Sequence, residues 1–156
     1  MKEHVCLKTN IYLKPIDKDN WEGALNLSVH DEQKEFVVSN LYSIAQVQFL
    51  ENFQAMGVYQ ENDMVGFAMY GIDPDDGNYW IYRVMVDKEH QGKGIGAAAV
   101  LSIIEDIQKR NSTNIPYIMI GYHPENMGAK MTYRKAGFVE TEVAPWGEQL
   151  ARFTLL

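Results

Sequence analysis

The sequence predicts a mixed α/β (α+β) fold, a twisted mixed sheet of about seven strands flanked by about four helices. Two observations predict it. Strand and helix patterns follow one another in the order βααβββαβαββ, and a glycine-rich loop at residues 91–96 joins an apolar strand to a strongly periodic helix. The chain has 156 residues, 46% of them hydrophobic, which is enough for one core. Because no linker, repeat or low-complexity tract divides it, we expect a single domain over residues 1–156.

The first half of the chain shows four strand patterns and two helix patterns. A loosely alternating segment predicts a strand over Val5–Leu13, which Pro15 should end. Helices are expected over Asn20–Val29, with Asn20 as candidate N-cap, and over Val38–Phe53. Turns rich in Asp, Asn and Gly then separate three strands, expected over Ala55–Gln60, Met64–Tyr70 and Tyr79–Val86.

The second half is more regular. After the loop Gln91–Gly96, apolar residues at helical spacing predict a helix over residues 97–110, which ends on Lys109 and Arg110, where cations suit the negative end of the helix. Gly137 is a typical residue just past the end of a later helix. The remaining strand, helix and two strands are expected over Tyr117–Tyr122, Asn126–Ala136, Phe138–Val143 and Gln149–Leu155.

The formal net charge of −7 is unevenly distributed. Residues 1–82 carry 5 Lys and Arg against 13 Asp and Glu, a net of −8, whereas residues 83–135 carry 8 against 5, a net of +3. An acidic chain repels phosphate backbones, so we expect no general nucleic-acid binding. A basic segment inside an acidic chain favours one anionic and one cationic ligand, although chance alone could produce this asymmetry.

Three further features of the sequence argue against a disulfide, a membrane span or signal peptide, and a metal site. A lone cysteine, Cys6, cannot form an intramolecular disulfide, and we expect it to be a small core residue. There is no run of about 18 apolar residues to span a membrane and no apolar signal-peptide run, so the expected location is the cytoplasm. We expect no bound metal, because His30, Asp31 and Glu32 are adjacent and their side chains would point in different directions.

The glycine loop between a strand and a helix predicts an anion site. Glycines let the backbone approach the anion, and the first helical N–H groups and the helix dipole point toward it. Three glycines beside Gln91 and Lys93 favour a pyrophosphate over a lone carboxylate. The Rossmann pattern is met only formally, because the loop does not lie in the first β-α turn. The phosphate loop of ATPases and GTPases is absent.

Two motifs at a matching separation resemble the GNAT superfamily of N-acetyltransferases. Its acetyl-CoA signature, Q/R-x-x-G-x-G/A, is matched by Gln91–Gly96, and its second motif, N-x-x-A-x-x-x-Y-x-K-x-G-F, by Asn126–Phe138. The strand Arg83–Asp87 also resembles the central strand of the family. The resemblance covers most of the chain. It implies the GNAT fold and an enzyme that uses acetyl-CoA as cosubstrate, with direct attack of an amine on the thioester in a ternary complex.

The resemblance also implies roles for single residues. Backbone N–H groups would bind the CoA pyrophosphate at Gln91, Gly92, Lys93, Gly94, Ile95, Gly96 and Ala97. Main-chain groups of Val84 and Val86 would pair with the pantetheine arm, and further cosubstrate contacts would come from Met85, Asn126 and Lys135. Tyr133 would be the general acid that protonates the departing thiolate, a role that suits a phenol because it keeps its proton near pH 7. Core packing is its alternative role.

The acceptor amine is specified less sharply. The stretches Met64–Gly71, Gln91–Gly94 and Tyr133–Phe138 resemble bacterial spermine/spermidine acetyltransferases, which implies a polyamine acceptor. A polycation needs carboxylates and aromatic faces. Candidates are Asp31, Glu32, Glu35, Tyr70, Asp73 and Tyr82, and those considered as proton acceptor are Glu32, Glu35, Asp73 and Tyr82. Each carboxylate could instead be a surface charge. Another amine (an aminoglycoside, an amino acid or a protein lysine), a catalytically silent CoA-binding module and a homodimer all remain open.

Overall fold

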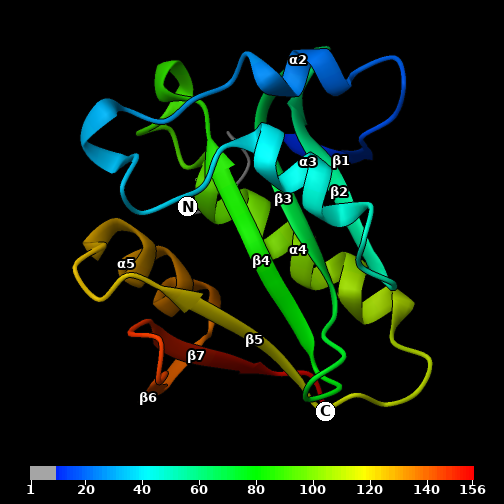
Figure 1. Ribbon diagram of the computed structural model, residues 1–156, viewed down its shortest axis with the longest axis vertical. Helices are drawn as coiled ribbons and strands as arrows, with labels where there is room; N and C mark the ends of the chain where they lie inside the picture. The colour runs from blue at the N-terminus through cyan, green and yellow to red at the C-terminus, as the bar shows by residue number, and fades with distance from the viewer. Residues whose placement is uncertain (1–9) are drawn as a thin grey trace, which may run out of the picture.

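The computed structural model describes residues 10–156, and a single mixed sheet forms the centre of the fold (Figure 1). The sheet has seven strands in the order β1-β2-β3-β4-β5-β7-β6, and neighbouring strands are antiparallel except β4 and β5. The strands are β1 (Ile11–Pro15), β2 (Phe53–Gln60), β3 (Asp63–Ile72), β4 (Tyr79–Val86), β5 (Tyr117–Tyr122), β6 (Val139–Val143) and β7 (Gln149–Thr154). The α-helices are α2 (Trp21–Leu25), α3 (Asn40–Val47), α4 (Ile95–Arg110) and α5 (Met127–Ala136), and the short 3₁₀ helices are η1 (Asp31–Gln33) and η2 (Lys88–His90).

The predicted fold class and order of elements are confirmed, but both early α-helices are shorter than expected. The helix expected over residues 38–53 stops early, because Asn52 turns the chain with a positive φ of 62° and β2 begins directly after it. The helix expected over residues 20–29 is also cut short, and the N–H of Ser28 donates to the carboxylate of Asp87, 2.9 Å away, instead of to a helical carbonyl. From β2 onward the expected ranges agree to within about two residues.

The first strand also departs from expectation. The segment Val5–Leu13 begins within residues 1–9, which lie outside the described residues together with Cys6. The strand does not stop before Pro15 but includes it, paired with Met56 of β2. Because β1 is an edge strand, a residue without an N–H group is tolerated at its end.

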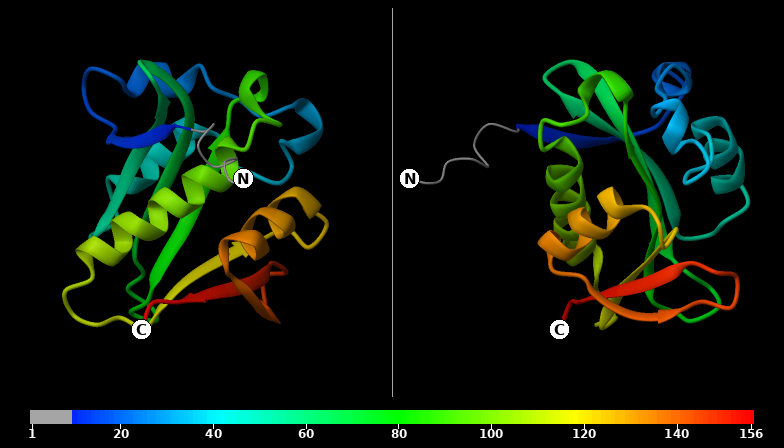
Figure 2. Two further views of the ribbon diagram at one scale, coloured as in Figure 1. Left: turned by 180° about the vertical axis from the view of Figure 1, so that it is seen from behind. Right: turned by 90° about the vertical axis from the view of Figure 1, so that its left-hand side faces the viewer.

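Helices cover both faces of the sheet (Figure 2). On one face α4 buries its apolar side, including Val100, Ile103 and Ile107, against the central strands. On the other face α2 and α3 pack over β2 and β3, where Phe67 and Met69 are fully buried. Within residues 10–156 none of the helices combines the length and apolar character needed to cross a lipid bilayer.

The sheet is open in its middle. β4 pairs with β3 as far as Val86, but with β5 only from Tyr79 to Ile81. Beyond Ile81 the two parallel strands diverge (Figure 1). On the side facing β5, the backbone groups of residues 82–86 therefore have no strand partner among the described residues. Unpaired backbone groups need water, a side chain or a ligand as hydrogen-bond partner.

A bulge at Tyr82 changes which side chains face each layer. The pairing of β4 with β3 skips Tyr82, so both Tyr82 and Arg83 lie on the α3 face. The ring of Tyr82 packs against Phe53 with centroids 4.4 Å apart, and the guanidinium of Arg83 donates to Gln46 Oε1 of α3 at 2.9 Å. Val84 then returns to the α4 face. Such bulges re-aim side chains beside functional sites.

We expect Ile103→Ala to lower the free energy of unfolding by about 2–5 kcal/mol, because the side chain is fully buried between α4 and the sheet and its loss leaves a cavity. Leu101 on the same helix is 53% exposed, so Leu101→Ala is the matched control and should cost about 0.5 kcal/mol or less. Urea denaturation of the three proteins measures both values. Equal decreases in the free energy of unfolding for the two variants would contradict the finding that Ile103, and not Leu101, faces the sheet.

Candidate functional site

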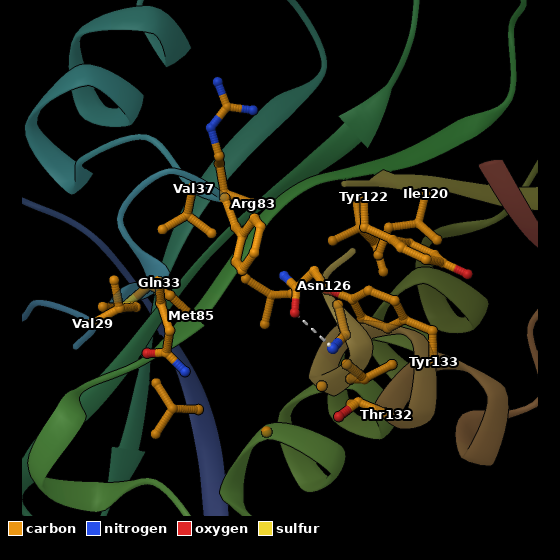
Figure 3. Close-up of a pocket in the computed structure, with 18 of the residues that line it drawn as sticks. Val29, Gln33, Val37, Arg83, Met85, Ile120, Tyr122, Asn126, Thr132 and Tyr133 are labelled. Atoms are coloured by element: carbon orange, nitrogen blue, oxygen red, sulfur yellow. Dashed lines mark hydrogen bonds between the residues drawn. The ribbon is translucent and has the colours of Figure 1, made fainter. Parts of the chain in front are cut away.

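A cavity of about 860 Å³ lies where β4 and β5 part. Its walls come from β4, the end of β5, the start of α4 and helix α5, and the segment 29–40 also lines it. Figure 3 shows Gln33 and Val37 of that segment on one side of the space, with Asn126 and Tyr133 on the other. A cavity of this size can hold a small-molecule ligand.

The glycine loop forms one end of the cavity. Gly92 and Gly94 have φ values of 80° and 82°, in the left-handed region that favours glycine, and Gly94 is the N-cap of the 16-residue α4. The first N–H groups of a helix have no helical acceptor, and they lie at the positive end of its dipole. Nδ1 of the neighbouring His90 is buried and has no hydrogen-bond partner within the described chain. This end of the cavity can therefore bind an anionic group.

The side chain of Gln91 holds this end together. Its Nε2 donates to the carbonyl oxygen of Val86 at 2.9 Å. The amide groups of Gln91 and Gln33 exchange two hydrogen bonds, each 3.1 Å long. These bonds join the end of β4, the glycine loop and the segment 29–40. The backbone of the loop, more than the Gln91 side chain, is thus the part that can meet an anion.

The middle of the cavity offers hydrogen bonds from two sides. The edge of β4 over residues 82–86, which has no partner strand on this side, forms one wall. Side chains already donate to its carbonyls at Tyr82 and Val86. On the other side of the cavity, Oδ1 of Asn126 caps α5 by accepting the N–H of Ala129 at 3.1 Å, drawn as a dashed line in Figure 3. The amide nitrogen of Asn126 is then the group that can donate to a ligand. An extended ligand with amide groups can pair with the edge of β4 as an added strand would.

Tyr133 on α5 is buried beside two other aromatic rings. Its ring centroid lies 5.5 Å from that of Tyr122 and 6.0 Å from that of Phe138, and the residue lines the cavity. Burial raises the pKa of its phenol, and the negative charge of Glu148 raises that pKa further. The phenol therefore keeps its proton at neutral pH and can donate to a negative charge that develops beside it.

The turn between β6 and β7 contributes to the far end of the cavity. Nε1 of Trp146 donates to Oε1 of Glu148 at 2.7 Å, and both residues line the cavity. Glu148 is the only carboxylate among the described residues that do so. Arg83 also lines the cavity, but its guanidinium is directed to α3, where Gln46 accepts from it (Figure 3). Burial lowers the pKa of Arg83.

Most residues predicted to contact acetyl-CoA lie around this one cavity. They are Val84, Met85, Val86, Gln91, Gly92, Gly94, Ile95, Gly96, Ala97, Asn126 and Lys135, and the predicted catalytic residue Tyr133 lies with them. Lys93 is exposed and lies outside the lining. The geometry thus brings the predicted set together, and the contacts with acetyl-CoA stay a prediction.

The acidic residues predicted for the acceptor in segment 29–40 do not line the cavity. Asp31, Glu32 and Glu35 are exposed, and Asp31 pairs with Lys34 at 3.0 Å. The same segment presents apolar and amide side chains to the cavity, namely Val29, Gln33, Phe36, Val37, Val38 and Asn40. The segment was expected to overhang the acceptor site with its carboxylates, and the structure turns those carboxylates to solvent.

Of the predicted acceptor residues in β3, β4 and the turn between them, one lines the cavity and two do not. Tyr70 is fully buried under α4, outside the cavity lining, and its hydroxyl donates to Oδ2 of Asp106 at 2.6 Å. Burial and the Asp106 carboxylate raise the pKa of Tyr70. Asp73 is buried in the turn after β3 and accepts the Tyr82 hydroxyl there. Tyr82 is the one member of the predicted acceptor set that lines the cavity.

Sequence reasoning missed Trp146 and Glu148. Both belong to a Pro-Trp-Gly-Glu turn, and turn residues of this kind are usually solvated. Their place in the cavity depends on Gly121 of β5, where an added Cβ would lie 2.8 Å from Oε1 of Glu148. No local sequence signal indicates such a contact, because it joins segments far apart in the chain.

Together these features describe one continuous site. The glycine loop can bind an anion, and the β4 edge can bind an extended amide-containing arm. Tyr133 lines the same cavity as the Glu148 carboxylate and the Trp146 indole, and it feels the charge of Glu148. A phenol that stays protonated and a carboxylate that can take a proton suit the transfer of an acyl group from a good leaving group to an amine.

The comparisons with known proteins agree with this geometry. A family model described as the acetyltransferase (GNAT) family matches residues 18–138. A probable spermine N(1)-acetyltransferase from Bacillus subtilis subsp. natto (strain BEST195) is 29% identical over 135 residues, which cover 83% of this chain and 88% of the relative.

Solved structures share the fold. An aminoglycoside acetyltransferase in complex with coenzyme A and kanamycin superposes with a TM-score of 0.76 at 17% identity, covering 93% of this chain and 95% of that one. A spermidine N-acetyltransferase from Vibrio cholerae in complex with CoA and spermine gives a TM-score of 0.69 at 16% identity, covering 91% and 92%. Because the family model spans most of the sequence and both predicted motifs, the chain belongs to the acetyltransferase (GNAT) family and is an N-acetyltransferase.

Proposed function

We propose that this protein transfers the acetyl group of acetyl-CoA to a primary amine of a polyamine such as spermine or spermidine, by direct attack in a ternary complex. The observation that carries the proposal is the continuous cavity, which joins the glycine loop at one end to Tyr133, Trp146 and Glu148 at the other. An anionic cosubstrate and a cationic acceptor could therefore bind in this cavity at the same time, as direct transfer of the acetyl group requires.

The proposed binding of acetyl-CoA depends mainly on hydrogen bonds from main-chain groups. The pyrophosphate would lie on Gly92–Ala97, where glycine φ values and the start of α4 direct N–H groups at a negative charge. The amides of the pantetheine arm would pair with the unpaired edge of β4 over residues 82–86, and Asn126 would donate from α5. Bound acetyl-CoA supplies the activated thioester, and the protein positions it.

Tyr133 would donate to the sulfur as the thioester breaks. Its pKa is raised by burial and by Glu148, so the phenol is protonated throughout the pH range of an ordinary assay. Because a phenol with a raised pKa is a weak acid, its main effect would be a hydrogen bond that stabilises the thiolate as charge develops, with the proton following.

The part of the cavity near Trp146 and Glu148 favours a positively charged acceptor. Glu148 is the only carboxylate of the described lining, and the indole of Trp146 beside it offers an aromatic face, which attracts ammonium groups. The net charge of −8 over residues 1–82 adds a long-range attraction for polycations. The similarity to a probable spermine N(1)-acetyltransferase supports a polyamine among the possible amines.

An acceptor panel tests the substrate. Thiol release from acetyl-CoA would be followed with spermine, spermidine, kanamycin and a lysine-containing peptide, with acetyl-CoA alone as the control. We expect kcat/KM for spermine or spermidine to exceed that for kanamycin by at least about tenfold, a difference of about 1.4 kcal/mol in transition-state binding. A preference for kanamycin or the peptide would contradict the polyamine assignment. Stabilisation by acetyl-CoA without turnover of any amine would indicate a silent CoA-binding protein.

A second experiment tests the role of Tyr133. Tyr133→Phe removes only the hydroxyl, so kcat should fall by about 100-fold or more while the Kd for acetyl-CoA stays within about threefold. Tyr70→Phe is the matched control, because the Tyr70 hydroxyl donates to Asp106 at 2.6 Å outside the cavity lining, and it should leave both constants near the wild-type values. Stopped-flow or steady-state kinetics and calorimetry measure the two constants. Comparable losses of turnover and of acetyl-CoA binding would make Tyr133 a packing residue.

A further inference from the structure

The turn between β6 and β7 fixes the position of the cavity's carboxylate. The N–H of Ala144 donates to the carbonyl oxygen of Glu148 at 2.7 Å and closes the turn. The N–H of the Trp146 indole then donates to Oε1 of Glu148 at 2.7 Å. The side chain of Glu148 is thus held at its backbone and at one carboxylate oxygen, which leaves Oε2 as the oxygen that can meet a ligand.

The carboxylate lies beside the point where the sheet opens. Gly121 follows Ile120, the last residue of β5 that pairs with β4. A Cβ added to Gly121 would lie 2.8 Å from Oε1 and 3.3 Å from Cδ of Glu148, so the carboxylate packs directly on the β5 backbone there. A substrate that enters the gap between β4 and β5 from the side of this turn would meet Glu148.

Electrostatics connect Glu148 with the reaction centre. Its negative charge raises the pKa of Tyr133 and also acts on Arg83, on which it opposes the effect of burial. The carboxylate is therefore within electrostatic reach of the phenol that would meet the leaving sulfur. None of the carboxylates suggested by the sequence, Asp31, Glu32, Glu35 and Asp73, lines the cavity.

We propose that Glu148 binds the acceptor amine and takes the proton that its nitrogen must lose, and that Trp146 positions the Glu148 carboxylate. This inference rests on the proposed function and supplies the proton acceptor that the sequence leaves open. Oε2 of Glu148 receives the ammonium group, while the indole N–H of Trp146 holds Oε1.

The step balances in atoms and charge. A primary amine is mostly protonated at neutral pH, since such groups have a pKa of about 10.4. Glu148 accepts one proton from the ammonium group, and the lone pair that this frees on the nitrogen forms a bond to the carbonyl carbon of the thioester. The C–S bond breaks, the sulfur leaves with the electron pair, and Tyr133 supplies the proton that makes the free thiol. The acylated nitrogen loses its second proton, which replaces the proton that Tyr133 gave to the sulfur, and Glu148 releases its proton to solvent, so one proton is released per acetyl group transferred.

Glu148→Gln tests this assignment, with Glu142→Gln as the matched control. Both changes remove one negative charge, and Glu142 lies exposed on β6 outside the cavity lining. We expect Glu148→Gln to lower kcat/KM for the best amine of the panel by about 100-fold or more at pH 7.5. The Kd for acetyl-CoA and the melting temperature should stay near the wild-type values, and Glu142→Gln should leave all of these within about twofold.

The pH profile separates proton transfer from a structural role. Without Glu148 the reaction depends on amine that is already neutral in solution, and the neutral fraction rises about tenfold per pH unit below the amine pKa. The deficit of Glu148→Gln should therefore shrink steadily between pH 7 and pH 9.5. Glu148→Asp should recover part of the activity. Trp146→Phe, which keeps an aromatic ring but removes the N–H donor, should show a smaller loss with the same pH trend.

The outcomes distinguish this inference from the proposed function. A deficit for Glu148→Gln that is constant with pH, or activity within about threefold of wild type, overturns the role of Glu148 while leaving amine acetylation intact. If the wild type prefers an amine other than a polyamine, the same variants measured with that amine still decide the question. If the wild type acetylates no amine, both proposals fail together.

Discussion

The short pairing of β4 with β5 is the constraint on which the rest of the site depends. If β4 and β5 were hydrogen-bonded along their whole length, there would be no opening between them. Their pairing stops at Ile81 and Ile120, and beyond these residues the two strands separate. The sheet thereby gives up hydrogen bonds over residues 82–86 and gains a backbone edge inside a cavity. Unpaired backbone groups in such a place are best satisfied by a ligand that carries its own amides.

Several other features support that opening. The bulge at Tyr82 turns Tyr82 and Arg83 toward α3, which keeps the guanidinium away from the centre of the cavity. Gln91 ties the end of β4 to the glycine loop and, through Gln33, to the segment that lines the opposite wall. The basic middle of the sequence then coincides with the loop and α5, and the carboxylate comes from the turn before β7. The uneven charge is consistent with one anionic and one cationic ligand.

The parts predictable from sequence are those with local signals. The periodicity of α4, the glycine loop and the strand before it depend on neighbouring residues, and they match the structure closely. The end of α3 does not, because the turn at Asn52 and the start of β2 override a partly periodic pattern. Tyr70 lies outside the cavity for a related reason. Its aromatic ring suits a cleft, but strand alternation directs it to α4 and Asp106. The sequence gives no sign that Glu148 lines the cavity, because its position depends on packing against Gly121, more than twenty residues earlier in the chain.

The central claim is that the cosubstrate lies in the gap between β4 and β5, on the backbone of both β4 and the glycine loop. Hydrogen–deuterium exchange of the intact protein with and without saturating CoA tests it most directly. The account predicts slowed exchange in peptides that cover residues 82–86 and 92–98, with β1 and β2 unchanged as the internal control. Binding of CoA that leaves residues 82–86 unprotected, or that protects the β1 edge instead, would contradict it.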